Sequence, residues 1–248
     1  MALAHAEREL AIFTSKITTE RAAEFNVQWP TEWTGDGHLR DMDASNPNTV
    51  LVRLSKGSEE WQFVENEWFK TGDASRAFSG TLLTVDRVQN KKAFEAYYSR
   101  VRLLASRNKS TFPKGTSIFV KANEHWMKHG TRATKPEVIY NGEQGLDYRY
   151  SGQGLFGIAA YTAEDAVYSH DYRHNVGDGT YQMFLVRVAA GNIEEIPNRT
   201  DAHMQYRVPS PGFDSVRGCV RDPNFKAIMV YQPDSAYPAY LLTYSQNA

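Results

Sequence analysis

The chain has 248 residues, 41% of them hydrophobic, and a formal net charge of −1. This composition favours neither a disordered chain nor a general polyanion binder, so nucleic acid is not an expected partner. The only cysteine, Cys219, excludes an intramolecular disulfide and favours a reducing compartment. No apolar run approaches the roughly 18 residues of a membrane span. We expect an intracellular protein, cytoplasmic or nuclear, without a membrane partner.

The first 28 residues are predicted to form a helical extension, because leucine, isoleucine and phenylalanine residues alternate with charged residues and alanines over residues 2–25. Asn26 to Asn48 is rich in Pro, Gly, Asp, Asn and Trp and is predicted to be a connecting loop. Residues 29–248 are assigned to one domain, since a single core grows to about this size before chains split.

The first part of this domain is predicted to contain two amphipathic helices with a strand between them. From Trp61 onward, apolar residues fall on one helical face, and the same spacing returns over residues 94–104. Residues 81–88, TLLTVDRV, alternate between apolar and polar as a half-buried strand does.

Strands are predicted to dominate the rest of the chain. Thr162 is the predicted N-cap of a helix over residues 163–172, with two acidic residues in its first turn. The predicted strands are SIFVKA (117–122), HWMKHGT (125–131), YQMFLVRVAAG (181–191), AIMVYQ (227–232) and AYLLTY (239–244). The pattern predicts an α+β domain with helices packed on largely antiparallel sheet.

Two further patterns favour simple structural interpretations. GQGLFG (152–157) matches the dinucleotide fingerprint G-x-G-x-x-G, but a polar segment precedes it instead of a buried strand, so a glycine-rich turn is predicted. His125 and His129 have the spacing of zinc ligands, but Trp126 replaces the general-base glutamate of a metalloprotease. A polar group past the predicted helix is interpreted as a solvated helix end; it comprises His170, Asp171 and His174. No metal is expected.

A series of segments follows in order along the chain. They are PTEW from Pro30, EEWQFVENEWFKT from Glu59, VDRVQNKKAFEAYYSRVR from Val85, HGT (129–131), GLDYR (145–149), FGIAAYTAEDAVYSHDY (156–172), YQMFLVRVAAG, FDSV (213–216) and AIMVYQPDSAYPAYLLTY (227–244). This ordered series resembles the catalytic domain of the poly(ADP-ribose) polymerase family, in its mono-ADP-ribosylating type. The resemblance implies an ADP-ribosyltransferase fold, in which two mostly antiparallel sheets form a cleft for NAD⁺ with helices outside.

The resemblance also implies the residues that bind NAD⁺. His129 would bind the adenosine ribose, and the main chain of Gly130 would bind the nicotinamide carboxamide together with Ser169. Tyr161 and Tyr172 would cover the two faces of the nicotinamide ring, although ordinary core packing is the simpler interpretation of either tyrosine alone. Two further positions are assigned to NAD⁺ binding, namely Thr131 and, on the adenosine side, Arg149.

At the third catalytic position the chain departs from elongating family members, so the triad reads His129, Tyr161 and Ala227. Alanine provides neither a hydrogen bond to the nicotinamide ribose nor activation of an acceptor hydroxyl. We expect a mono-ADP-ribosyltransferase that uses NAD⁺ as substrate, releases nicotinamide and modifies a protein side chain. The alternatives are a catalytically silent module, serving as an NAD⁺ sensor or a protein-interaction domain, and an NAD⁺ glycohydrolase.

Other departures from the family pattern lie close to these positions. Lys128 replaces the usual apolar residue before the histidine, Ala160 precedes the triad tyrosine, and Ser235 replaces a glutamine. The loop between Arg149 and Phe156 is shorter than in many members.

Overall fold

The structure, a computed structural model, describes residues 27, 29–33, 49–107, 112–196, 208–221 and 225–246. The helix predicted over residues 2–25 lies outside these ranges. Within the predicted loop, Thr31–Trp33 forms a short 3-10 helix, η1, and its Trp33 ring stacks on Trp29 at 5.6 Å between centroids. The chain divides into two units, Met1–His38 and Leu39–Ala248, and every element from β1 onward belongs to the second unit.

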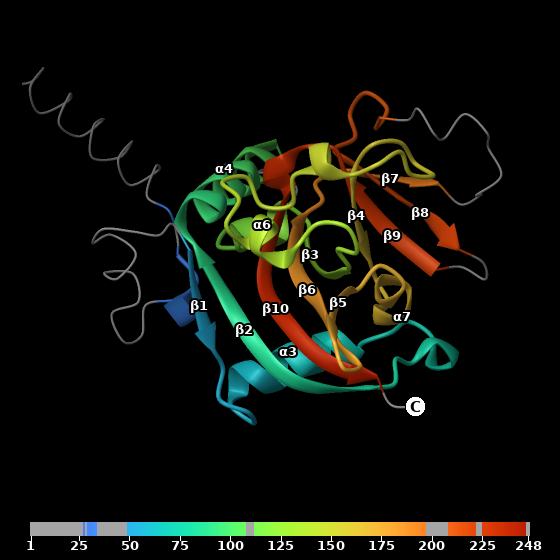
Figure 1. The fold of residues 1–248 in the computed structure, drawn as a ribbon. Coiled ribbons are helices and arrows are strands. Elements are labelled where there is room, and N and C mark those ends of the chain that lie inside the picture. Colours follow the sequence, from blue (N-terminus) through green and yellow to red (C-terminus); the bar gives the residue numbers. More distant parts are fainter. Residues whose placement is uncertain are drawn as a thin grey trace, which may run out of the picture. The chain divides into compact units, whose positions relative to one another are not determined.

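The described strands of the second unit form one mixed, mostly antiparallel sheet in the order β1-β2-β10-β6-β3-β4-β9-β8-β7, with β5 paired to β6 (Figure 1). Their bounds are β1 Thr49–Arg53, β2 Gly80–Asn90, β3 Glu124–His129, β4 Ala160–Ala163, β5 His174–Gly177, β6 Thr180–Ala189, β7 Ile193–Ile196, β8 Ser215–Arg221, β9 Phe225–Val230 and β10 Ala236–Gln246. β7 and β8 run parallel. The predicted α+β class is confirmed.

The expectation of two sheets differs from the observed pairing, because a narrow link joins the two halves. β3 pairs with β6 from Glu124 to His129, and β4 pairs with β9 from Ala160 to Ala163. Between β3 and β4 the pairing consists of Lys128 opposite Ala163. The strands therefore form one continuous sheet that is weakest between β3 and β4.

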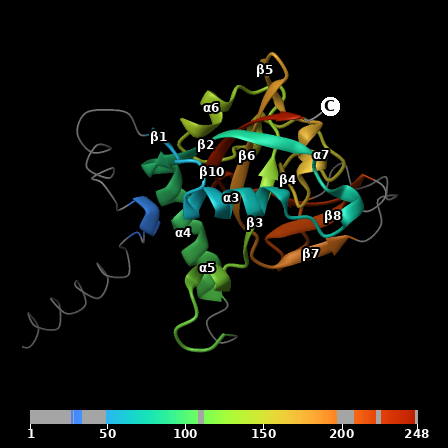
Figure 2. The same cartoon turned by 90° about the horizontal axis from the view of Figure 1, so that it is seen from below.

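The helices flank this sheet, and Figure 2 shows α3 running across the central strands. The Ser58 side chain caps α3 by accepting from the Trp61 main-chain N–H, as expected for an N-cap serine. The predicted apolar stripe of α4 is buried, from Phe94 to Leu104. The helices are α3 Glu59–Phe69, α4 Lys91–Arg107, α5 Ile118–Lys121, α6 Pro136–Tyr140 and α7 Ala166–His170, with 3-10 turns η2 Ala74–Arg76, η3 Tyr148–Tyr150 and η5 Pro233–Ser235.

Two local predictions are wrong. The segment 117–122 is predicted as a strand, but Ile118–Lys121 is helical, because the Ser117 hydroxyl accepts from the Phe119 N–H and starts a turn. The helix predicted over residues 163–172 begins only at Ala166. Thr162 belongs to β4, where its hydroxyl donates to the Ile228 carbonyl at 2.9 Å and so does not cap the helix.

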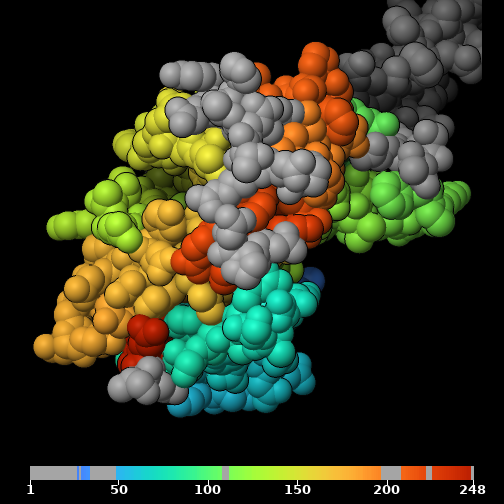
Figure 3. Space-filling view, turned by 90° about the vertical axis from the view of Figure 1, so that its right-hand side faces the viewer, coloured from blue at the N-terminus to red at the C-terminus, as the bar shows by residue number. Residues whose placement is uncertain are grey.

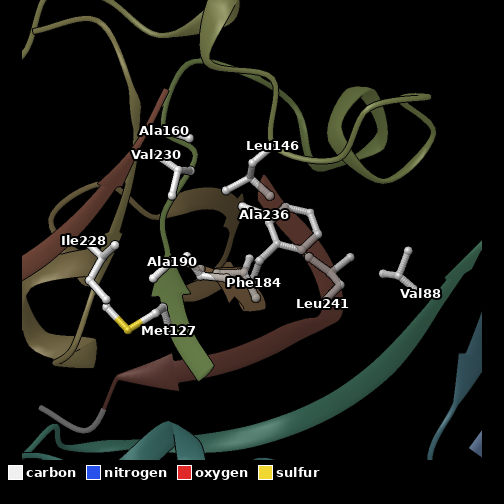
Figure 4. Packing of buried hydrophobic residues seen from close by; sticks show 12 residues of the cluster. Val88, Met127, Leu146, Ala160, Phe184, Ala190, Ile228, Val230, Ala236 and Leu241 are labelled. Carbon is white, nitrogen blue, oxygen red and sulfur yellow. The ribbon is translucent and has the colours of Figure 1, made fainter. Parts of the chain in front are cut away.

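The core lies on both sides of the central strands. Figure 4 shows one cluster in which Phe184 of β6 lies among Met127, Ile228 and Leu241 from three other strands. A second cluster packs beneath the glycine-rich turn and the β8–β9 hairpin; it comprises Phe156, Ala159, Val216, Val220, Phe225, Ala227, Met229 and Tyr231. These clusters fix the strands whose ends carry the candidate site.

Candidate functional site

Two adjoining hollows open beside the ends of β3 and β4, and they share His129 and Ser151. The first has a volume of about 410 Å³ and is lined by His129, Gly130, Ser151, Gly152, Gln153, Gly154, Leu155, Tyr161, Ala163, Tyr168, Ser169, Tyr172 and Val220. The second, of about 270 Å³, includes Thr131, Ile139, Glu143, Leu146, Asp147, Arg149 and Tyr150. The paired arrangement suits an elongated ligand with two ends.

His129 stands at the end of β3, where the two hollows meet. Its Nδ1 lies 2.8 Å from the main-chain oxygen of Tyr161, so Nδ1 carries the proton and donates. Removal from water lowers the pKa of His129, and the hydrogen bond to the Tyr161 carbonyl only partly opposes this. The neutral ring therefore leaves Nε2 free of a proton, as a hydrogen-bond acceptor.

Gly130 follows at a point where two backbones meet closely. A Cβ atom at Gly130 would lie 2.6 Å from the main-chain oxygen of Tyr172, so only glycine fits here. The buried Ser169 lies at the same close contact between backbones, and its hydroxyl donates to the main-chain oxygen of Lys128 at 3.0 Å. The end of β3 and the end of α7 are thus held against each other.

The Tyr161 ring packs on the glycine-rich turn predicted over residues 152–157. Its hydroxyl accepts from the Phe156 N–H at 2.7 Å and donates to the Gly157 oxygen at 3.0 Å. The ring fits only because Gly154 has no side chain, since a Cβ atom there would lie 2.5 Å from Tyr161 Cζ. Burial raises the pKa of Tyr161 to about 12, so its hydroxyl stays protonated at neutral pH.

Tyr168 and Tyr172 lie side by side in the first hollow, with ring centroids 5.4 Å apart and hydroxyls 3.4 Å apart. Burial raises the pKa of Tyr168 above that of an ordinary phenol. Two arginines brace these rings from outside, since Arg132 lies over Tyr172 at 5.5 Å and Arg221 over Tyr168 at 5.4 Å. Both guanidinium groups also bind Asp171, one at its main-chain oxygen and the other at its carboxylate.

The second hollow contains the two remaining predicted residues. Thr131 is buried and its hydroxyl donates to the Thr134 carbonyl. Arg149 is exposed, and its Nε donates to both carboxylate oxygens of Asp147 at 2.8 and 2.9 Å, while Nη2 reaches Gln144 at 2.9 Å. These bonds lower the pKa of Asp147 and pair its carboxylate with the arginine charge.

Ala227 is completely buried and lines neither hollow. Ala227 belongs to β9, where its partner on one side is Ala163 of β4 and on the other side Gly218 of β8. Of these two partners, Ala163 lines the first hollow. The cluster around Ala227 is apolar. Among the described residues lining the first hollow there is no carboxylate.

The structure brings five predicted residues to the first hollow, namely His129, Gly130, Tyr161, Ser169 and Tyr172. Sequence reasoning missed the contributions of Ser151, Gln153, Leu155, Tyr168 and Val220. One signal was present for Tyr168, because it lies four residues before Tyr172 in a predicted helix, and residues at this spacing share a face.

The histidines weighed as metal ligands have other neighbours. His125 Nε2 lies 3.0 Å from Asn123 Oδ1, and His170 Nδ1 lies 2.7 Å from the Tyr244 hydroxyl within an aromatic cluster. Over the described ranges, no group of three or more His, Cys, Asp and Glu side chains is placed to hold a metal ion. No helix among the described residues is both long and apolar enough to cross a membrane.

Comparison with known proteins shows the family of the chain. The sequence profile of the poly(ADP-ribose) polymerase catalytic domain matches residues 58–222. The chain therefore belongs to the family of poly(ADP-ribose) polymerase catalytic domains. It is 29% identical over 200 residues to a protein of Dictyostelium discoideum described as a probable poly [ADP-ribose] polymerase. The alignment covers 79% of this chain and 53% of that relative, so the chain spans about half the length of the relative.

Proposed function

We propose that this domain binds NAD⁺ and transfers a single ADP-ribose from it to a protein side chain. The observation that carries the proposal is the pair of adjoining hollows that share His129 at the close contact between Gly130 and the end of α7. NAD⁺ has two halves, nicotinamide with its ribose and adenosine, that match two adjoining hollows. The family to which the chain belongs suggests the reaction, which is transfer of ADP-ribose from NAD⁺.

The first hollow is assigned to nicotinamide. The main-chain N–H and C=O of Gly130 bind the carboxamide, and the Ser169 hydroxyl turns from the Lys128 oxygen toward the carboxamide oxygen. Tyr161 and Tyr172 cover the ring, and aromatic stacking of this kind contributes about 1 kcal/mol per pair beyond surface burial. Tyr168 extends the same aromatic wall.

The second hollow is assigned to adenosine. His129 Nε2 accepts from a hydroxyl of the adenosine ribose, which the neutral state of the ring permits. Thr131 and Arg149 line this side. Because Arg149 is already paired with Asp147, its contribution is one of shape and hydrogen bonding rather than of net charge.

In the reaction, the bond between the nicotinamide nitrogen and the ribose carbon breaks, and its electron pair leaves with neutral nicotinamide. The ribose carbon gains oxocarbenium character and is attacked by a nucleophilic oxygen or nitrogen of the acceptor, which then loses its proton. The protein contributes by holding the leaving group and the ribose in place while charge moves from one to the other.

Transfer of one ADP-ribose, rather than growth of a polymer, is proposed from Ala227. Elongation requires a group that activates a ribose hydroxyl of the growing chain, and the buried methyl group of Ala227 has no such capacity. Ala227 itself lines neither hollow, and none of the described residues that line the first hollow carries a carboxylate. The acceptor side chain therefore has to attack without activation by a carboxylate of this domain.

The test is incubation of the protein with NAD⁺ carrying a labelled adenosine, followed by mass spectrometry of intact and digested protein. Single additions of ADP-ribose on protein side chains are expected, together with released nicotinamide. Polymer ladders contradict mono-transfer, and free ADP-ribose without protein adducts indicates a glycohydrolase. Calorimetric binding of NAD⁺ without turnover indicates a sensor, and a folded protein that binds no NAD⁺ indicates an interaction domain.

A further inference from the structure

Lys128 binds both ends of one segment that leads into the first hollow. Its side chain is almost completely buried, and Nζ donates to the main-chain oxygen of Glu164 at 2.7 Å. Its own main-chain oxygen accepts from the Ser169 hydroxyl at 3.0 Å. Before nicotinamide binds, Lys128 therefore holds the beginning of the 164–169 segment through its ammonium and the end of it through its main-chain oxygen. The ammonium bond is the one that persists once the Ser169 hydroxyl turns to the carboxamide.

The same ammonium reaches a second element of the fold. Nζ lies 3.2 Å from the main-chain oxygen of Lys70, directly after α3. A cationic donor is well placed at the carbonyl end of a helix, where the backbone oxygens lack partners within the helix. Lys128 thus joins α3 to the junction between β4 and α7.

Neighbouring contacts fix this junction to the chain that follows α3. The Asp165 carboxylate accepts from the Thr71 hydroxyl at 2.5 Å and pairs with Arg76 at 3.1 Å. Figure 3 shows the segment 71–76, in cyan, on the same face as β8 and β9, in dark orange. Polar bonds therefore hold the junction to the chain that follows α3: Asp165 binds Thr71 and Arg76, and Lys128 Nζ binds the main-chain oxygens of Lys70 and Glu164.

The charges that face Lys128 come from both elements packed against it. Glu67 and Lys70 belong to the α3 side, and Glu164 and Asp165 to the junction. The oxygens of Lys70 and Glu164 that accept from Nζ both belong to the main chain, so the lysine acts by orienting backbone.

We infer that Lys128 is a positioning residue for the nicotinamide half of the site, because it sets the distance between the end of β3 and the segment that carries Ser169 and Tyr172. The inference rests on the proposed NAD⁺ binding. It makes a selective prediction, because Ser169 and Tyr172, which follow the junction that Lys128 holds, line the first hollow and not the second.

The experiment measures two fragments of the dinucleotide separately. Nicotinamide and ADP-ribose are titrated by calorimetry into the wild-type chain and into Lys128→Met, which keeps the length and loses the donors. Loss of the two hydrogen bonds should weaken nicotinamide binding by about fivefold to tenfold and leave ADP-ribose binding within about twofold. Val101→Ala, buried in α4 and outside both linings, is the control for general loss of stability.

Equal weakening of both fragments in Lys128→Met, or no change in either, overturns the inference. If Lys128→Met does not fold, the same titrations on Lys128→Gln, which keeps a shorter neutral donor, decide between these results. A wild-type chain that binds neither fragment refutes the proposed function itself, and this outcome is distinct from a failure of the Lys128 inference.

Discussion

The backbone of Gly130 runs directly against that of Tyr172, and a Cβ atom at Gly130 would lie 2.6 Å from the Tyr172 main-chain oxygen. Gly130→Ala must therefore push the end of β3 away from the end of α7. Overpacking of this kind costs about 1 to 3 kcal/mol, so NAD⁺ affinity should fall by about fivefold to a hundredfold in calorimetry. Gly152→Ala is the matched control, because it lines the same hollow with open space around its Cβ position. Equal affinities of the two variants would contradict the assigned contact.

Tyr161→Phe should separate the two tasks of that tyrosine. The variant loses the hydroxyl that serves the Phe156 N–H and the Gly157 oxygen, and a buried group left without its partner costs about 1 to 3 kcal/mol. Tyr231→Phe loosens the same turn from its other side, because the Tyr231 hydroxyl donates to the Phe156 oxygen at 2.8 Å. Both variants should unfold at lower denaturant concentration, whereas nicotinamide release should stay close to that of wild type in both, because Tyr161→Phe keeps the ring that covers nicotinamide. A loss of nicotinamide release in Tyr161→Phe but not in Tyr231→Phe would contradict this and would assign the Tyr161 hydroxyl a part in the reaction.

Burial lowers the pKa of Lys128 from 10.5 to about 8. Between these two pH values the unfolded chain keeps a proton that the folded chain has lost, so the free energy of unfolding should rise with pH across this window. The contribution is at most about 3 kcal/mol. Urea titrations of wild type and Lys128→Met over the window provide the measurement, and the difference between them cancels the other titrating groups. A pH-independent difference contradicts the buried position of the ammonium.

Ala227→Glu should not restore polymer synthesis. The carboxylate would enter an apolar cluster without a partner, which costs about 2 to 5 kcal/mol of unfolding free energy. Ala227→Gln has the same size without the charge and separates the two effects. Chemical denaturation gives the stability, and gel analysis of the products detects polymer. Polymer ladders from Ala227→Glu would show that the glutamate side chain reaches the hollow past Ala163.

Long apolar patterns predicted the fold well. The stripe from Phe94 to Leu104 becomes the buried face of α4, and the alternating run 81–88 lies within β2. Short elements were harder, because one capping hydrogen bond outweighs strand propensity over four residues, as Ser117 shows for α5. The single pair between β3 and β4 joins the two expected sheets into one. It depends on how distant parts of the chain pack together, and no pattern in the sequence indicates it.

The candidate site was predictable where a residue follows from family resemblance, and it was not where the residue depends on packing. His129, Gly130, Tyr161, Ser169 and Tyr172 do converge on one hollow, while their individual roles stay predictions. The bonds of Lys128 join residues 58 and 36 positions away, so the sequence revealed only an unusual polar residue in a strand.

The one-residue contact between β3 and β4 has a mechanical consequence. β10 and β6 share a long ladder from Ala236 to Ser245, whereas β3 and β4 share one ladder pair, Lys128–Ala163. Side chains of β3 add two further bonds, from His129 to the Tyr161 oxygen and from Lys128 to the Glu164 oxygen. The separation of β3 and β4 therefore depends chiefly on side-chain bonds, whereas that of β6 and β10 is set by a ladder of main-chain bonds.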